Sequence, residues 1–236
     1  MPTKWIPYIK VIVHLVCLLP AIKLVEMYRS GALALMADPV NWITHFTGYW
    51  ALYLLMVSLA VTPVRRLHTR LGNLIRFRRM LGLYAFFYAT LHLATYVFLF
   101  SGYDLPTVWA GLKGGHFGRV VEQWKLIWPT VIDDLQKRRF IQVGFFAWCI
   151  LLLLAATSPA FVMRAMGGKN WRRVHWSVYL AACAGITHYW WLVKKGVMAP
   201  LPFTVVFFTL IGARVFWWAK RKLSKRAGAP AVAVTP

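Results

Sequence analysis

The chain has 236 residues, of which 60% are hydrophobic and only 14% are charged, and its mean hydropathy is +0.57. About a quarter of the residues in a soluble domain are charged, so this composition excludes an ordinary soluble domain and indicates an integral membrane protein. The net charge of +22 would suggest nucleic-acid binding in a soluble protein, but here the basic residues gather between apolar runs, which argues against that class.

Six apolar runs follow one another along the chain, and about 20 helical residues cross a bilayer core. The first run has no small-x-small cleavage site before Glu26, so we assign it as a helix and not as a signal peptide. No run alternates with period two, as membrane β-strands do. We therefore predict an all-α, polytopic membrane bundle of six transmembrane helices. The predicted spans are residues 8–28, 46–63, 80–101, 140–158, 174–193 and 202–219.

Basic residues are concentrated after the second, fourth and sixth runs, and the positive-inside rule places these segments, and with them both termini, in the cytoplasm. The six acidic residues lie in or at the edge of the opposite-side regions. Three basic residues before the fourth run, Lys137, Arg138 and Arg139, run against the rule, which long loops obey less strictly.

Residues 102–139 separate the third and fourth runs, and we expect them to form a long periplasmic loop. The second half of this loop mixes apolar and charged residues at helical spacing, which predicts an interfacial amphipathic helix with Trp124 and Trp128 as anchors. The Pro- and Ala-rich tail, residues 223–236, is expected to be cytoplasmic and disordered.

The spans carry histidines where a pump or transporter would carry carboxylates. The sequence also has no Walker loop, no G-x-G-x-x-G and no C-x-x-C-H, which excludes covalent c-type haem. A single span histidine commonly makes an interhelical hydrogen bond, but several together favour metal or haem ligation. The histidines in or at the ends of spans are His14, His92, His175 and His188.

The depths of two of these histidines match. His92 lies 13 residues after Arg79, and His188 lies 15 residues after Arg173, which puts both about 20 Å from the cytoplasmic ends of their helices. Both imidazoles are then about two thirds of the way across a ~30 Å core. We predict that His92 and His188 are the axial ligands of one haem iron.

His175 lies about 20 Å nearer the cytoplasm and ~140° around a straight helix from His188. The third helix offers no histidine at that level, so His14 is the candidate partner for an inner site. This inner site holds a second haem with an unusual ligand, a flavin, or no cofactor. A lone outer haem would be poorly connected to the cytoplasm, because electron transfer falls steeply with distance.

Five arginines near the inner level are candidates for binding haem propionates or a flavin phosphate. They would serve equally well for membrane topology and lipid headgroup contact. They are Arg76, Arg78, Arg79, Arg172 and Arg173.

Four segments resemble one known family: "ADPVNWITHFTG", "TPVRRL", "RRMLGLYAFFYATLHLATY" and "WRRVHWSVYLAACAGITHYWW". They are similar to MsrQ, the haem-binding membrane subunits of bacterial periplasmic methionine sulfoxide reductase systems, which belong to the ferric-reductase-like transmembrane family. The resemblance covers most of residues 5–220 and implies a transmembrane domain of this family over residues 1–222.

The resemblance also implies haem b and FMN, in a multi-pass protein of the bacterial inner membrane. Electrons would come from quinol or a cytoplasmic flavin reductase and pass to the periplasmic molybdenum-containing subunit MsrP, which reduces methionine sulfoxide in oxidised proteins. The family's haem-associated histidines match His92, His175 and His188. Larger relatives carry two histidines on the third helix and this chain carries one, which argues against a full two-haem pathway.

Two other functions remain open from the sequence. The first is a stand-alone metalloreductase that reduces ferric chelates or oxygen at the outer face. The second is a non-redox helical scaffold or transporter whose histidines bond between helices. In the favoured interpretation the chain is the redox subunit of an oxidoreductase complex and performs no chemistry on the substrate.

Overall fold

A computed structural model describes residues 5–227 and shows only helices and turns in that range. Three short helical turns, η2 (Ala32–Leu35), η3 (Thr69–Leu74) and the π-helical η4 (Tyr96–Phe100), flank the longer helices. The longer helices are α1 (Ile6–Arg29), α2 (Pro39–Val64), α3 (Ile75–Thr95), α4 (Leu105–Lys113), α5 (Gly118–Lys137), α6 (Arg139–Ala156), α7 (Ala160–Met166), α8 (Gly168–His175), α9 (Val178–Leu192) and α10 (Leu201–Ala227).

Five helical segments of the described chain are long and apolar enough to cross a membrane. They are Ile6–Arg29, Pro39–Val64, Leu71–Phe100, Arg139–Ala156 and Leu201–Ser224. The helical membrane fold is thus as predicted, while the count of six spans and the orientation of the termini stay predictions.

The fifth predicted run, residues 174–193, is divided between α8 and the 15-residue α9. The chain tightens between them, because the Ser177 backbone N–H donates to Val174 O at 3.0 Å and its hydroxyl donates to the same oxygen at 2.7 Å. A serine hydroxyl that competes for a backbone carbonyl favours such a break. The helix therefore begins irregularly just after His175, and the straight-helix angle between His175 and His188 does not apply.

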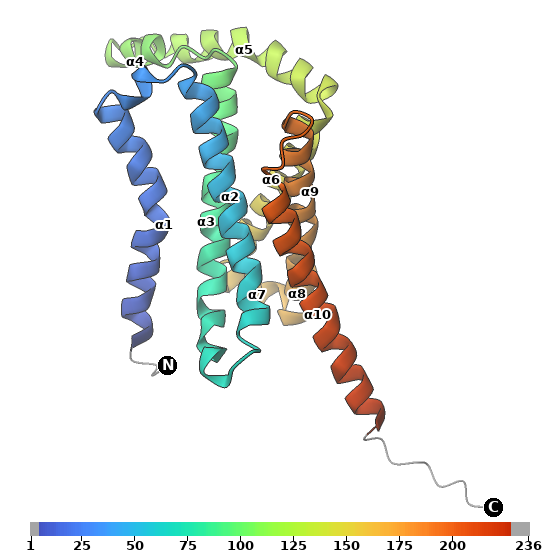
Figure 1. Cartoon of the computed structure of the whole chain (residues 1–236). Helices are drawn as coiled ribbons and strands as arrows, with labels where there is room; N and C mark the ends of the chain where they lie inside the picture. The colour runs from blue at the N-terminus through green and yellow to red at the C-terminus, as the bar shows by residue number, and fades with distance from the viewer. Residues whose placement is uncertain (1–4, 228–236) are drawn as a thin grey trace, which may run out of the picture.

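The helices α2, α3, α6, α9 and α10 form the bundle, in which α2 packs along α3 and α6 along α9, while α1 stands to one side (Figure 1). The start of α2 is set locally. The Asp38 carboxylate accepts the Asn41 backbone N–H at 2.9 Å, and Pro39 occupies the first helical position. The helix consequently begins earlier than the apolar run at residue 46.

The segment 102–139 contains two helices, of which α5 lies where the sequence predicts an amphipathic helix and α4 was not expected. The helices α4 and α5 lie across one end of the bundle (Figure 1). Asp104 caps α4 by accepting the Thr107 backbone N–H at 3.0 Å. On α5, Trp124 packs against Phe98 and Tyr103 in a small apolar cluster, whereas Trp128 is exposed. Trp128 is therefore the more accessible of the two predicted anchors, since Trp124 is partly buried.

The three basic segments lie at one end of the bundle. Both ends of the described chain, the α2–α3 connection, α7, α8 and the end of α10 lie opposite α4 and α5 (Figure 1), so all three basic segments share one end. At that end α10 continues to Ala227, into the segment expected to be a disordered tail, while residues 228–236 lie outside the described part.

A fully buried tyrosine holds α1 to the bundle. The Tyr88 hydroxyl donates to Cys17 O at 2.7 Å and accepts the Ala21 backbone N–H at 3.1 Å. The hydroxyl thus lies between the Cys17 carbonyl and the Ala21 backbone N–H of α1. Pro20, beside them, has no N–H to donate within the helix.

Candidate functional site

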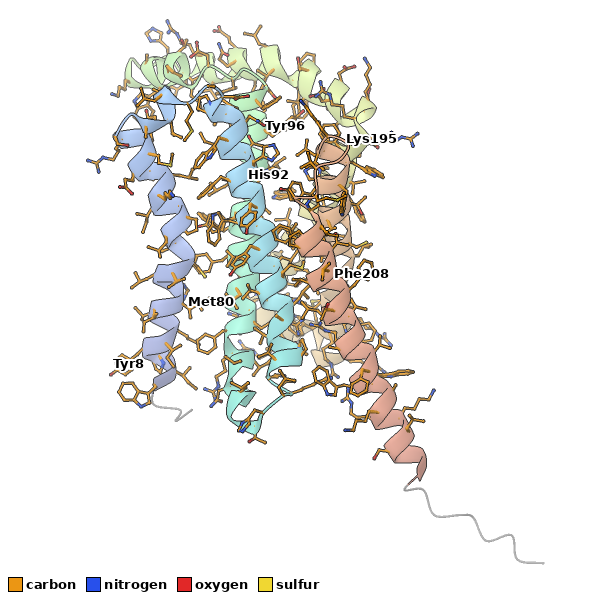
Figure 2. The ribbon with its side chains drawn as sticks, in the orientation of Figure 1. Tyr8, Met80, His92, Tyr96, Lys195 and Phe208 are labelled. Carbon is orange, nitrogen blue, oxygen red and sulfur yellow. The ribbon has the colours of Figure 1, made fainter. Side chains whose placement is uncertain are left out.

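His92 and His188 meet between α3 and α9. Their ring centres are 6.0 Å apart, and the ring planes are inclined at 79°. Figure 2 shows His92 in the upper part of α3, below Tyr96 and far from Met80, which places the pair near the end covered by α4 and α5. The structure therefore brings together the two histidines for which the sequence predicts one level.

Each of the two rings is oriented by a backbone carbonyl on a neighbouring helix. His92 Nδ1 lies 2.9 Å from Thr44 O on α2, and His188 Nδ1 lies 2.7 Å from Phe140 O on α6. A carbonyl oxygen only accepts hydrogen bonds, so Nδ1 carries the proton in both rings and Nε2 keeps its lone pair. This second hydrogen bond is typical of histidines that bind a metal.

Two glycines let these rings approach the helices so closely. A Cβ added at Gly48 would lie 3.0 Å from His92 Nδ1, and one added at Gly144 would lie 2.6 Å from His188 Nδ1. Each glycine is one helical turn beyond the carbonyl that its histidine contacts, and each histidine follows that carbonyl by 48 residues. The pairs α2–α3 and α6–α9 thus repeat one local arrangement.

Our reasoning from the sequence missed Gly48 and Gly144. The signal was present, because a glycine inside an apolar span marks a place where another group comes close to the backbone. The sequence alone does not say which group that is.

The spacing of the two rings fits an axial pair on haem iron. A metal–nitrogen bond of about 2 Å, plus ~1.1 Å from nitrogen to ring centre, on each side puts two axial imidazoles about 6 Å apart. A metal ion without a porphyrin fits less well, since the described residues contain no group of three or more His, Cys, Asp or Glu side chains that could hold it. Haem needs only two ligands from the protein.

His175 has different neighbours. Its Nε2 lies 3.2 Å from the Thr157 hydroxyl at the end of α6, and its ring stacks on Trp171 at 3.9 Å. Trp171 in turn donates from Nε1 to Thr157 O at 2.8 Å. These contacts fix His175 at the level of the basic end.

His14 is not brought next to His175. Its Nδ1 lies 2.8 Å from the Tyr84 hydroxyl on α3. The helices α1 and α8 are on opposite sides of the α2–α3 pair (Figure 1). The structure therefore does not bring His14 and His175 together, because α1 packs on the face of α3 that carries Tyr84.

Of the five arginines proposed for the inner level, one turns toward the interior. Arg78 on α3 is half-buried. The other four are exposed at the basic end, and they are Arg76, Arg79, Arg172 and Arg173.

The structure adds Arg214, which sequence reasoning overlooked inside the sixth run. Its guanidinium donates to Leu210 O at 2.9 Å and to Leu59 O on α2, and it lies over the Tyr179 ring at 5.2 Å. Leu59 O needs this donor because Pro63, four residues later, has no N–H. An ionisable residue inside a span was the available signal.

Residues 47–186 match the family described as ferric reductase like transmembrane component. Over 221 residues the chain is 41% identical to the protein-methionine-sulfoxide reductase heme-binding subunit MsrQ of Xanthomonas oryzae pv. oryzae (strain MAFF 311018), with 92% of this chain and 88% of that protein covered. It is 39% identical to MsrQ of Herminiimonas arsenicoxydans over 216 residues, which are 90% of this chain and 87% of the relative. The matched range includes Gly48, His92 and Gly144 and ends just before His188.

Proposed function

The chain belongs to the MsrQ family of haem-binding subunits within the ferric reductase like transmembrane proteins, and from this membership we propose that it carries electrons across the bacterial inner membrane to a periplasmic methionine sulfoxide reductase. The observation that carries the proposal is the pair His92 and His188, with both Nδ1 atoms bonded to carbonyls and ring centres 6.0 Å apart.

His92 and His188 would hold a b-type haem, which supplies reversible one-electron transfer when bound. Thr44 O and Phe140 O keep each imidazole in the tautomer that presents Nε2, and Gly48 and Gly144 leave room for the rings. The chain thus sets the orientation of both ligands from two separate helix pairs before the haem binds, which favours a single coordination geometry.

Electrons would enter the helical bundle at its basic end. His175 and Arg78 would bind an inner cofactor, either a second haem or FMN. Quinol or a cytoplasmic flavin reductase would reduce this cofactor. The place of His175 and Arg78 on α8 and α3, toward the basic end of the bundle and away from His188, supports this assignment. The acceptor would be the molybdenum-containing MsrP subunit, docked at the end of the bundle that α4 and α5 cover.

The visible spectrum of the purified protein tests the proposal. Reduced bis-histidine haem shows sharp α and β bands, and His92→Ala and His188→Ala should each abolish them, whereas His116→Ala in the α4–α5 turn should not. Unchanged haem content in both site variants would refute the ligand pair, and a parent protein without haem would leave the scaffold interpretation. Rapid reduction of ferric chelates in the absence of MsrP would favour the metalloreductase.

A further inference from the structure

Asp134 on α5 differs from the other acidic residues of the chain. All six acidic residues lie within residues 5–227, and Asp134 is the one that is not exposed. Its side chain is 15% exposed, against 53% for the neighbouring Asp133. Both carboxylate oxygens have partners, because Oδ2 accepts the Tyr96 hydroxyl at 2.7 Å and Oδ1 lies 2.8 Å from Arg138 Nε. A carboxylate that leaves water is costly unless it is paired, so these contacts favour one arrangement of the three side chains.

Tyr96 joins this carboxylate to the helix of His92. It follows His92 by one helical turn, and its backbone N–H donates to His92 O. It is also the first residue of the π-helical turn η4, and short π-helical turns are frequent at functional sites. Figure 2 shows Tyr96 above His92, at the end of the bundle that α4 and α5 cover. The tyrosine hydroxyl therefore connects the His92 end of α3 to α5.

Arg138 joins the same carboxylate to the partner that orients His188. It is the single residue between α5 and α6, with an extended backbone at φ −99° and ψ 99°. Its backbone N–H donates to Asp134 O at 2.9 Å, so Asp134 holds this residue through its main chain as well as its side chain. Two residues later comes the Phe140 carbonyl, which lies 2.7 Å from His188 Nδ1. The place of this carbonyl depends on how the chain turns at Arg138.

Asp134 thus lies where the two halves of the histidine pair meet. His92 belongs to the α2–α3 pair and His188 to the α6–α9 pair, and the carboxylate has one contact toward each. The two contacts are not equal. The Arg138 side chain is 51% exposed, and an ion pair with such a partner contributes little by itself. The hydrogen bond from Tyr96 is partly buried, so we expect it to contribute more.

We propose that Asp134 is a positioning residue of the outer haem site. Through Tyr96 and Arg138 it holds the end of α3 and the start of α6 at the separation that His92 and His188 need to bind one iron. The helix α5 then has a second role besides its contact with the membrane surface, because it links the two halves of the site. This role rests on the proposed haem site, and one part of its test needs no haem.

The test uses the full-length chain in nanodiscs, both with haem and expressed without haem in a haem-deficient host. The variants are Asp134→Ala, Asp134→Asn, Tyr96→Phe, and Tyr96→Phe combined with Asp134→Ala. Asp133→Ala is the matched control, because Asp133 is the adjacent residue on α5 and its ion pair with Lys137 is exposed.

Three measurements are made. The electron paramagnetic resonance spectrum of the ferric haem depends on the angle between the two axial imidazole planes. Transfer of haem to apomyoglobin gives the rate of haem loss. In the haem-free chain, deuterium exchange reports how firmly the α5–α6 junction is held.

Asp134→Ala and Tyr96→Phe should each speed haem loss about three- to tenfold. This is less than the 10- to 100-fold typical of groups that contact a ligand histidine directly, because Asp134 acts one contact further away. Both variants should shift the ferric spectrum, and Asp134→Ala should raise exchange at the α5–α6 junction. Asp134→Asn keeps an acceptor for Tyr96 and should lie between parent and Asp134→Ala. The double variant should lose haem no faster than Asp134→Ala, since Tyr96 has then already lost its acceptor.

Asp133→Ala should match the parent in all three measurements. An Asp134→Ala variant with the ferric spectrum and the rate of haem loss of the parent would overturn the inference, and so would an Asp133→Ala variant that changes as much. If Asp134→Ala does not fold, Tyr96→Phe decides by the same two measurements, because it removes a single hydroxyl. Failure of the haem site itself is recognised separately, since His92→Ala would then keep the haem content of the parent. Failure of the role of Asp134 leaves haem bound in the parent and absent from His92→Ala.

Discussion

Replacing Gly144 by alanine is the sharpest test of how the two histidines are held. The new Cβ would lie 2.6 Å from His188 Nδ1, 2.9 Å from Cε1 and 3.1 Å from Cγ. Ordinary contact needs about 3.5 Å or more, so the ring must shift by roughly 1 Å. Because Cγ is crowded as well, rotation of the ring about its own bond does not remove the clash.

This shift acts on the bond that sets the orientation of the ring. His188 Nδ1 is 2.7 Å from Phe140 O, one turn before the substituted position, so a ring displaced from α6 loses that hydrogen bond. Loss of such a second hydrogen bond typically weakens metal binding by about 10- to 100-fold, or ~1.4–2.7 kcal/mol. Gly48→Ala should cost less, since its Cβ would be 3.0 Å from His92 Nδ1.

The assay is haem content per protein, with the sharpness of the reduced α band, in the purified variants. Gly212→Ala on α10 is the matched control, because its Cβ would meet nothing within 4 Å. We expect the order parent and Gly212→Ala, then Gly48→Ala, then Gly144→Ala. If Gly144→Ala bound haem as the parent does, with the same spectrum, the close approach of His188 to α6 would have no part in haem binding.

Three further substitutions test other parts of the structure. His175→Ala should leave the α band of the outer haem intact but slow its reduction from the basic side in stopped-flow measurements; equal rates in variant and parent would contradict a role for His175 in the inner half. Tyr88→Phe removes hydrogen bonds to Cys17 and Ala21 and should destabilise the packing of α1 by about 2 kcal/mol, measured by thermal unfolding, while the exposed Tyr8→Phe should be neutral. Asp38→Ala removes the cap of α2 and should cost about 1 kcal/mol by the same measurement, and an unchanged midpoint would show that Pro39 suffices to start the helix.

Reasoning from the sequence succeeded where the physics is local. Hydropathy over about 20 residues predicted the five helices that are long and apolar enough to cross a membrane, because a backbone in lipid must form its hydrogen bonds within one segment. The constant rise of about 1.5 Å per residue gave the heights of His92 and His188, and their rings lie 6.0 Å apart. Local capping signals at Asp38 and Asp104 also precede α2 and α4 in the sequence.

Tertiary structure decided the groups that surround those histidines. Which carbonyl accepts each Nδ1, and why Gly48 and Gly144 face the rings, depends on how helices 48 residues apart in sequence pack together, and periodicity along one helix carries no information on that. The same holds for His14, which contacts Tyr84 and not His175, and for Arg214, which reaches a carbonyl that Pro63 leaves free on another helix. The sequence by itself determined which groups lie at each depth of the membrane, because depth follows from the count of residues along a helix. Only the packing of the helices decided which of those groups touch, because contact depends on the rotation and neighbours of each helix.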